Sequence, residues 1–432
     1  MDPKRDDFSE QTIFFDTPTE DTPVKVRSPK QKNTSPRKKQ NVKNSPATFA
    51  PGADGSHTIV PQPERKTATP WSVTWKISTY LWKLALGVAL VIAIAMLGLV
   101  GYLTVTEYNP AYAENAKRGS VNRSESITNR SLKLVTFNTG HAGSGKDEDS
   151  AEHGGTGTRP DEQTVKSYMD GIQTFLDGRS VDFLFLQEVD VESDRSFGVN
   201  QWLTYEASME DYESRFAMNF SCDYLPYPLS EPVGKVNSGL ATYSAYDITS
   251  ATRYSLSSSY TWPSRMANPK PCLLVSRIPI DGSEQELVLI NLQLEATDNT
   301  EDEDEQYQQL LSLMKAEYAK GNYVIAGGDF NRYFPWSRAY AVEDETVWTP
   351  ESLPYPPTGW TFAYDDKKPT CRLMDQPFEI SNVEHQFYVI DGFFLSPNIT
   401  VDDVITLDYQ FRYSDHNPVL LEFTLETSAA TE

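Results

Sequence analysis

The chain has 432 residues, enough for one large domain or two ordinary ones. Its charge is uneven. The first 83 residues hold 14 Lys and Arg against 9 Asp and Glu, a net of +5; residues 84–105 hold none; the remainder holds 24 basic against 52 acidic residues, a net of −28. So acidic a C-terminal part disfavours long nucleic acid as a partner, because such binding depends on Lys and Arg at the phosphates. Three cysteines, Cys222, Cys272 and Cys371, are too few for a disulfide framework.

Residues 1–83 are rich in Pro, Ser, Thr and charged residues and poor in large apolar side chains, which predicts a disordered basic tail. Residues 84–105 are 22 uncharged, mostly apolar residues that would span about 33 Å as a helix, which matches the core of a bilayer. We expect a transmembrane helix there rather than a buried core helix or a cleaved signal peptide. The reasons are that 83 residues precede the segment and that Trp and Tyr residues flank it.

The basic tail favours a cytoplasmic N-terminus, although the residues directly beside the apolar segment show little charge bias. We therefore expect a single-pass protein of the cell membrane whose large acidic part lies outside the cytoplasm. Residues 106–130 are polar and predict a stalk. Residues 131–426 contain no convincing linker and predict one domain, followed by a C-terminal tail over residues 427–432.

The domain begins with residues 132–138, which alternate between apolar and polar as a strand does. Residues 164–177 place apolar side chains on one helical face, and residues 181–186 form a continuous apolar run typical of a buried strand. Further strands are expected at residues 240–243, 272–276, 287–294, 323–326, 387–395 and 419–423, and further helices at residues 202–208 and 306–319. Several strands follow one another closely, which favours an α/β fold with mixed sheets over a repeated βαβ unit.

The Gly-rich, acidic stretch 140–161 predicts a loop. Its first residues, Gly140 to Asp147, nearly fit a phosphate-cradling P-loop, but Asp147 stands where a Ser or Thr should hold the metal. No helical pattern follows the stretch either. The sequence therefore indicates no nucleotide cofactor.

Polar side chains end several of the predicted strands, where functional groups gather in layered α/β folds. Asn138 ends the first strand, Glu188 follows the second, and Asp329 and Asn331 follow a later one. Glu188 is either a solvent contact or a ligand for a hard cation such as Mg²⁺. Asp329 could take a proton and the amide of Asn331 could fix an oxygen, although Asp and Asn after Gly are also ordinary turn residues.

His416 is one of five histidines and stands between Asp415 and the pair Asn417-Pro418, just before the last predicted strand. A histidine near a carboxylate can be held in one tautomer and can exchange a proton near neutral pH. The alternative is an Asp-His turn before an edge strand. The sequence contains no Gly-x-Ser-x-Gly, His-Glu-x-x-His or Cys-x-x-Cys, so it supports neither a nucleophilic triad nor a zinc site.

Taken together, six motifs resemble those of the endonuclease/exonuclease/phosphatase superfamily, metal-dependent phosphodiesterases that include DNase I-like nucleases, neutral sphingomyelinases and inositol phosphatases. They occur in the family's order as Thr-Phe-Asn at 136–138, Leu-Gln-Glu-Val at 186–189, Asn-Leu-Gln-Leu at 291–294, Gly-Asp-Phe-Asn at 328–331, Ile-Asp-Gly-Phe-Phe at 390–394 and Ser-Asp-His-Asn-Pro at 414–418. The resemblance covers residues 132–426 and implies a four-layer α/β sandwich of two packed mixed β-sheets with outer helices. Flanking stretches at 106–110, 187–191, 195–197 and 369–372 resemble a membrane-anchored branch common in Gram-positive bacteria.

The resemblance implies a metal-dependent hydrolase. Glu188, helped by Asn138 and Asp415, would bind Mg²⁺ or Mn²⁺, and the metal would stabilise charge on a phosphate oxygen. Asp329 and Asn331 would position or deprotonate the attacking water.

The remaining residues of the resemblance would contact the phosphate. His416, oriented by Asp391, would hydrogen-bond it and stabilise the charge that develops there. Further substrate contacts are expected from Asn291, Gln293, Arg372 and Arg195. For the two arginines the alternative is a surface or structural role.

Gln293 departs from the family's pattern, because many members have Asn-x-His where this chain has Asn-Leu-Gln. Glutamine can donate a hydrogen bond but cannot carry a proton. Two hypotheses follow: a membrane-anchored, metal-dependent phosphodiesterase or phosphatase, and a catalytically inactive binding or scaffolding domain on the same fold. The candidate substrates are phospholipid headgroups, inositol phosphates and extracellular nucleic acid, the last not favoured by the charge.

Overall fold

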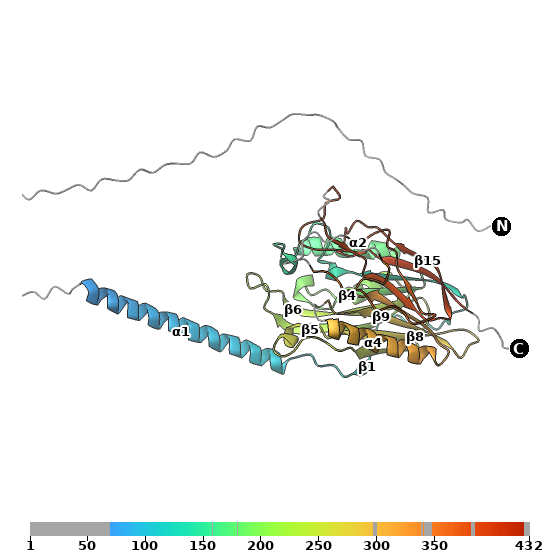
Figure 1. Ribbon diagram of the computed structural model, residues 1–432, viewed down its shortest axis with the longest axis horizontal. Coiled ribbons are helices and arrows are strands. Elements are labelled where there is room, and N and C mark those ends of the chain that lie inside the picture. Colours follow the sequence, from blue (N-terminus) through green and yellow to red (C-terminus); the bar gives the residue numbers. More distant parts are fainter. Residues whose placement is uncertain are drawn as a thin grey trace, which may run out of the picture. The chain divides into compact units, whose positions relative to one another are not determined.

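The computed structural model describes residues 70–426 except residues 158, 179, 297–299, 338–339, 341–347 and 382–384 (Figure 1). The predicted disordered tail lies outside the described residues up to residue 69, and so does the whole of the predicted C-terminal tail. The described residues form one long apolar helix and a layered α/β domain.

Helix α1 spans Pro70–Val105 and contains the whole apolar segment predicted from the sequence. Its stretch Ser78–Val105 is long and apolar enough to cross a membrane, judged by length and composition. The expected helix is therefore confirmed, but it begins earlier than predicted, because residues 70–83, assigned to the disordered tail, are helical. Its position in a membrane stays a prediction.

The first of two large sheets has seven strands in the order β1-β7-β8-β9-β10-β14-β11. Neighbouring strands are antiparallel, except β9 and β10, which are parallel. In sheet order the strands span Ala113–Asn115, Ser250–Ser255, Cys272–Pro279, Glu286–Gln293, Tyr323–Asp329, Asp391–Leu395 and Thr361–Ala363.

The second large sheet also has seven strands, in the order β15-β16-β3-β4-β6-β5-β2. Its one parallel pair is β3 and β4. In sheet order the strands span Ile399–Thr406, Val419–Leu425, Ser131–Asn138, Phe183–Asp190, Gly234–Ser244, Glu213–Leu225 and Lys117–Arg118. The mixed character expected from the spacing of the strands is confirmed in both sheets.

The two sheets pack face to face and bury a shared apolar core that includes Leu134 of β3 and Ile325 of β10. The outer face of the second sheet is covered by α2 (Glu162–Asp177) and α3 (Gln201–Ser208), and that of the first sheet by α4 (Thr300–Tyr318). Each large apolar side chain buried in this way contributes about 1.5–3 kcal/mol relative to exposure, so the three apolar interfaces hold the layers together. The expected four-layer α/β sandwich is confirmed.

The strand predicted at residues 387–395 is two strands in the structure. β13 (Phe387–Tyr388) pairs with β12 (Cys371–Arg372) in a small separate sheet, whereas β14 joins the first large sheet. Thr370 explains the break, because its hydroxyl oxygen accepts the backbone N–H groups of the two residues at the start of β14 and just before it. These bonds replace strand pairing at that point, so one apolar run in the sequence covers two separate strands.

Residues 106–130, expected to form a stalk, contribute an edge strand to each large sheet. β1 pairs with β7, and β2 pairs with β5. Ile127 is buried in the core between the sheets and forms a β-bridge with Ile280. The segment is thus packed on the sandwich rather than extended away from it.

The two parallel strand pairs bring polar residues to one edge of the sandwich. β3 and β4 place Asn138 beside Gln187, and β9 and β10 place Gln293 beside Asp329. β14 begins at the same edge, with Asp391 opposite Asp329. A hydrogen bond from Asn138 to Asp329 joins the two sheets there.

Candidate active site

Asp329 ends β10 directly after a Gly-Gly pair. Gly328 has φ +146°, and a Cβ there would lie 1.9 Å from the carbonyl oxygen of Leu292 in β9. Only glycine lets the two backbones approach so closely. The close approach sets Asp329 beside Gln293 of β9 and Asp391 of β14.

The carboxylate of Asp329 is buried and held by amide groups. Asn331 donates its backbone N–H to Oδ1 over 2.9 Å and its side-chain N–H to Oδ2 over 3.3 Å, and Asn138 donates to Oδ2 over 3.1 Å. Burial raises the pKa of Asp329 above its usual range. The positive charge of His416 lowers this pKa but does not outweigh burial, and the negative charge of Asp391 raises it further. A carboxyl group with a raised pKa is suited to take a proton from water.

His416 and Asp391 form a buried pair next to Asp329. Nδ1 of His416 lies 2.8 Å from Oδ2 of Asp391, and Nε2 lies 3.8 Å from Oδ2 of Asp329. Burial alone would lower the pKa of His416, but the negative charge of Asp391 outweighs burial, and the pKa lies well above its ordinary value. The imidazole is therefore charged at neutral pH and fixed in orientation by Asp391.

Glu188 reaches the same edge through an irregularity in β4. The pairing of β4 with β6 shifts register at Glu188, whose φ is +54°. A bulge of this kind re-aims a side chain. Oε1 accepts hydrogen bonds from Asn138 over 3.1 Å and Gln293 over 2.8 Å, and Oε2 lies 3.3 Å from Nδ1 of His141. Burial alone would raise the pKa of Glu188, but the hydrogen bond and charge of His141 outweigh it, so the pKa is lowered and the carboxylate is ionised.

His141 comes from the Gly-rich loop after β3, in the short 3₁₀ turn η1 (Gly140–Ala142). Its backbone is left-handed, with φ +46°. Gln201, buried at the start of α3, donates to the carbonyl oxygen of His141 over 2.7 Å and accepts the N–H of Asp190 over 2.9 Å. A Cβ on Gly143 would lie 2.7 Å from the imidazole, so this glycine makes room for the ring.

Sequence reasoning missed His141. The sequence of this loop was compared only with a nucleotide-binding P-loop, in which Asp147 takes the position of the metal-binding Ser or Thr. That comparison assigns no role to His141. The signal that could have found His141 is local: it follows Asn138, the polar end of a strand, by three positions, and glycines stand on both sides of it.

Arg372 holds this loop in place. Its guanidinium is buried and donates to three backbone carbonyl oxygens of residues 144–148, over 2.9, 3.0 and 3.5 Å. Arg372 therefore has a structural role, and because it also lines the cavity described below, its contact with a substrate stays a prediction. Arg195 lines the cavity described below and makes two hydrogen bonds, of 3.0 and 2.9 Å, with the buried carboxylate of Asp190.

Asn291 and Gln293 both lie on β9 but have different surroundings. Asn291 is fully buried, and its amide bonds to two backbone carbonyl oxygens of the second sheet and to Gln187. It ties the two sheets together and is not among the described residues that line the cavity. Gln293 faces the cavity, donates to Glu188 and accepts a 3.3 Å hydrogen bond from Asn219.

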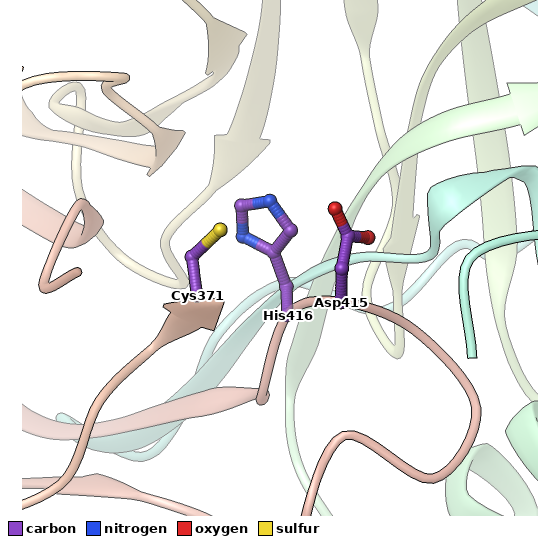
Figure 2. A group of neighbouring side chains, drawn as sticks. All are labelled: Cys371, Asp415 and His416. Atoms are coloured by element: carbon purple, nitrogen blue, oxygen red, sulfur yellow. The ribbon is translucent and has the colours of Figure 1, made fainter. Parts of the chain in front are cut away.

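Cys371 and Asp415 flank His416 (Figure 2). In Figure 2 the sulfur of Cys371 points toward one side of the imidazole, and Asp415 stands on the other side. One potential ligand atom from each of the three lies within 4.8 Å of the others. Burial raises the pKa of the Cys371 thiol to about 12, so the sulfur is protonated, whereas metals bind the thiolate. Asp415 itself accepts a 2.5 Å hydrogen bond from the hydroxyl of Ser144.

A cavity of about 900 Å³ opens over these residues. The site residues that line it are His141, Glu188, Arg195, Gln293, Asp329, Asn331, Arg372, Asp415 and His416. Asn138 and Asp391 are not lining residues themselves, but they hydrogen-bond to Glu188, Asp329 and His416, which are. Eight of the eleven residues singled out from the sequence thus line one cavity.

The side chains around Glu188 fit a hard divalent cation. Mg²⁺ takes oxygen ligands and needs only one or two protein carboxylates, and Glu188 supplies an ionised one that is 30% exposed. His141 offers a nitrogen atom beside it. Their separation of 3.3 Å is near the roughly 3 Å expected between neighbouring ligand atoms on one metal with bonds of about 2.1 Å. Asn138 turns its N–H group toward Glu188 and its oxygen toward the N–H of Gly140.

The fold and the site together define a layered α/β protein in which carboxylates, amides and a carboxylate-paired histidine meet where two mixed sheets share an edge. The chain belongs to the endonuclease/exonuclease/phosphatase family, whose model matches residues 135–416. Members of this family are hydrolases that act on phosphoester bonds. The resemblance inferred from the six motifs is confirmed at the level of the family.

Solved structures with a similar fold include an endonuclease/exonuclease/phosphatase from Beutenbergia cavernae, with 16% identity and a TM-score of 0.47, covering 69% of this chain and 72% of that one. TDP2 from C. elegans has 17% identity, a TM-score of 0.42 and coverages of 69% and 77%. The catalytic domain of human Nocturnin with bound sulfate has 16% identity, a TM-score of 0.41 and coverages of 72% and 97%. Comparison with curated proteins gave no match.

Proposed function

We propose that this chain is a membrane-anchored, metal-dependent hydrolase that cleaves a phosphoester by the attack of water. The observation that carries the proposal is the meeting of Glu188, Asp329 and the His416–Asp391 pair at one cavity. The family match supports the class of reaction, because its members act on phosphoester bonds.

Glu188 is the proposed primary ligand for Mg²⁺ or Mn²⁺, with Asn138, Asp415 and His141 as further candidates. When bound, the metal would polarise a phosphoryl oxygen and stabilise the charge that develops on it. Asn138 could bind the metal through its amide oxygen only after its side-chain amide group flips, since its N–H group faces Glu188 in this structure. Gln293 holds the other side of the Glu188 carboxylate through its 2.8 Å hydrogen bond.

Asp329 is the proposed base. Its buried carboxyl has a raised pKa, so it can hold a water molecule and take the proton that the water loses during attack. Asn331 assists, because its side-chain N–H groups bond to the carbonyl oxygen of Leu294 over 2.8 Å and to Asp329 over 3.3 Å. With the N–H groups fixed, the amide oxygen is the group left to orient the water.

His416 is the proposed donor to the phosphate. Its ring is charged and is held at Nδ1 by Asp391, which leaves Nε2 to hydrogen-bond a phosphate oxygen. Arg195, anchored by Asp190 and 16% exposed, adds positive charge to the same cavity. These groups are fixed before the substrate arrives, so the protein spends little free energy on reorganisation.

Membrane anchoring through α1 is part of the proposal. The apolar stretch Ser78–Val105 and the basic residues that precede it support a single-pass arrangement with a cytoplasmic N-terminus and an extracytoplasmic catalytic domain. A catalytically inactive binding domain remains the second candidate, favoured by Gln293, which cannot carry a proton. The engagement of Gln293 with Glu188 supports the active form, because it keeps that carboxylate in place.

The test uses the purified full-length chain in detergent and a soluble phosphodiester such as bis-p-nitrophenyl phosphate. We expect turnover with Mg²⁺ or Mn²⁺ and its loss on addition of a chelator. Asp329→Asn, which keeps the shape of the side chain, is expected to lower the rate by about 10²–10⁴-fold. Turnover that survives the chelator, or no turnover with either metal, would support the second candidate or another chemistry.

A further inference from the structure

Two loops form one wall of the cavity. The first follows β5 at residues 226–233, and the second lies between β7 and β8 at residues 256–271. Their cavity-lining side chains are mostly apolar or aromatic, among them Tyr227, Val233 and Tyr260. Such a wall favours a substrate that carries an apolar part next to its phosphate.

The same loops expose large apolar side chains outside the cavity. Leu229 is 87% exposed and Trp262 is 54% exposed. Both loops adjoin β5: the first follows this strand directly, and the backbone N–H of Lys270 in the second donates to the carbonyl oxygen of Asn219 in β5. Apolar side chains gathered on adjoining loops mark a surface that meets an apolar partner.

The end of α1 lies against β5 and the second loop. Leu103 is buried together with Cys222 of β5 and Met266 of the second loop. The indole N–H of Trp262 donates to the hydroxyl oxygen of Thr104 over 3.2 Å. The apolar wall of the cavity is therefore continuous with the point where the apolar helix ends.

The position of these loops follows from the proposed anchoring. The uncharged run of α1 ends at Val105, so the last turn of the helix lies where the chain leaves the bilayer. The second loop, which contacts this turn, therefore lies at the membrane surface, where Trp and Tyr are enriched in membrane proteins. Trp262 is thus placed to enter the leaflet, and we expect the same of Leu229, because its loop leaves the strand β5 whose Cys222 packs against Leu103 of the helix end.

The charges of the cavity suit one phosphate rather than a chain of them. Among the described residues that line it there is no lysine, and the arginines are Arg159, Arg195 and Arg372. Arg195 is held by Asp190, Arg372 by backbone carbonyls, and Arg159 lies 3.6 Å from Glu231. A nucleic acid strand needs several cations along its phosphates, whereas a headgroup needs contacts at one.

We propose that the phosphoester cleaved at this site belongs to the headgroup of a membrane phospholipid. The acyl chains stay in the leaflet beside α1, and the headgroup enters the cavity past the apolar wall of the two loops. This inference rests on the proposed function and names its substrate class. In the reaction the oxygen of water bonds to phosphorus, one P–O ester bond breaks, and the released oxygen takes up a proton, so a phosphodiester lipid gives a phosphomonoester and an alcohol.

The test reconstitutes the full-length chain into vesicles of phosphatidylcholine, phosphatidylglycerol and sphingomyelin with Mn²⁺ and measures release of the water-soluble product. Single-stranded DNA and RNA oligonucleotides and bis-p-nitrophenyl phosphate are assayed in parallel. Leu229→Glu removes an exposed apolar side chain that does not line the cavity. Ile380→Glu is the matched control, since Ile380 is 71% exposed and is not among the residues that line the cavity.

We expect hydrolysis of lipid in the vesicles, a fall of about tenfold or more for Leu229→Glu on vesicles, and no fall for Ile380→Glu. The rate of Leu229→Glu on the soluble ester should equal that of the wild type, which also shows that the variant is folded. Cleavage of the oligonucleotides and the soluble ester without cleavage of lipid would overturn the inference and leave the proposed function standing. Equal rates of Leu229→Glu and wild type on vesicles would overturn it too, whereas failure with every phosphoester would overturn the proposed function itself.

Discussion

His416 owes its charge at neutral pH to Asp391, whose carboxylate lies 2.8 Å from Nδ1. Asp391→Asn keeps the shape of the side chain and removes the negative charge, so the pKa of His416 is expected to fall. NMR titration of the imidazole would show a ring that stays protonated through neutral pH in the wild type and titrates at lower pH in the variant. An unchanged midpoint would mean that Asp391 does not hold the charge of His416.

The same pair makes the stability of the fold depend on pH. The pKa of His416 is higher in the folded protein than the ordinary value of 6.5. Its contribution to the free energy of unfolding is therefore fully present below that value and is lost as the pH rises through the folded pKa. Denaturant unfolding at neutral and alkaline pH should show a larger loss of stability toward alkaline pH in the wild type than in Asp391→Asn, and parallel curves would contradict this.

His141 is expected to strengthen metal binding at Glu188. His141→Ala removes the nitrogen beside Oε2, so the affinity for Mn²⁺ should fall by about tenfold, with a smaller effect on Mg²⁺, which prefers oxygen ligands. Binding is measured by calorimetry, or by the EPR signal of free Mn²⁺, without any substrate. Glu188→Gln serves as the reference for loss of the site, and His153→Ala as a control at another cavity histidine. Equal Mn²⁺ affinity in His141→Ala and wild type would exclude His141 as a ligand.

Among single residues, the sequence predicted those that lie next to apolar strands and missed those whose contacts depend on the conformation of a loop. Asp329, Glu188 and His416 could be found because each adjoins a strand that hydrophobic pattern alone predicts. His141 and the role of Arg372 could not, because the contacts of a loop depend on which distant carbonyl oxygens and side chains it meets after folding. Arg372 bonds to residues more than 220 positions away along the chain.

The turn at the end of β10 sets the position of Asp329, the proposed base. Gly328→Ala would place a Cβ 1.9 Å from the carbonyl oxygen of Leu292 and would hold a non-glycine residue at φ +146°. We expect a loss of about 2–4 kcal/mol in the free energy of unfolding, together with a displaced Asp329 and a lower rate.

Gly282→Ala is the control for this turn. Gly282 also has a positive φ, of +69°, but a Cβ there meets no atom within 4 Å, so the variant is expected to lose only about 1 kcal/mol. Urea unfolding compares the two variants. Similar losses in both would mean that the contact with Leu292 does not constrain the turn.

Strong apolar runs predicted the strands in the middle of each sheet, whereas β5, β7, the edge strands and the breaks escaped prediction. β15, at the edge of the second sheet, has mostly half-buried or exposed positions and several polar residues, so its pattern is weak. The division between β13 and β14 depends on hydrogen bonds to Thr370, which lies 20 residues upstream of the break. Local pattern carries no information on a partner at that distance.

For the whole molecule, residues 106–130 are predicted to be part of the folding unit. A fragment that starts at residue 131 lacks β1, β2 and the buried Ile127, and it leaves the buried Glu206 without the N–H and hydroxyl of Ser120. Its Tm should lie more than about 5 °C below that of a fragment starting at residue 106. Equal Tm values would mean that this segment only connects the helix to the domain.

The central claim is that this edge of the sandwich activates water against a phosphoester. The most direct measurement is the rate of metal-dependent hydrolysis of bis-p-nitrophenyl phosphate by the full-length chain and by Asp329→Asn, at concentrations of Mn²⁺ that saturate both. Turnover in the wild type and a fall of about 10²–10⁴-fold in the variant, with Mn²⁺ still bound, is the predicted result. Equal rates in the two proteins, or no turnover in a wild type that binds Mn²⁺, would contradict it.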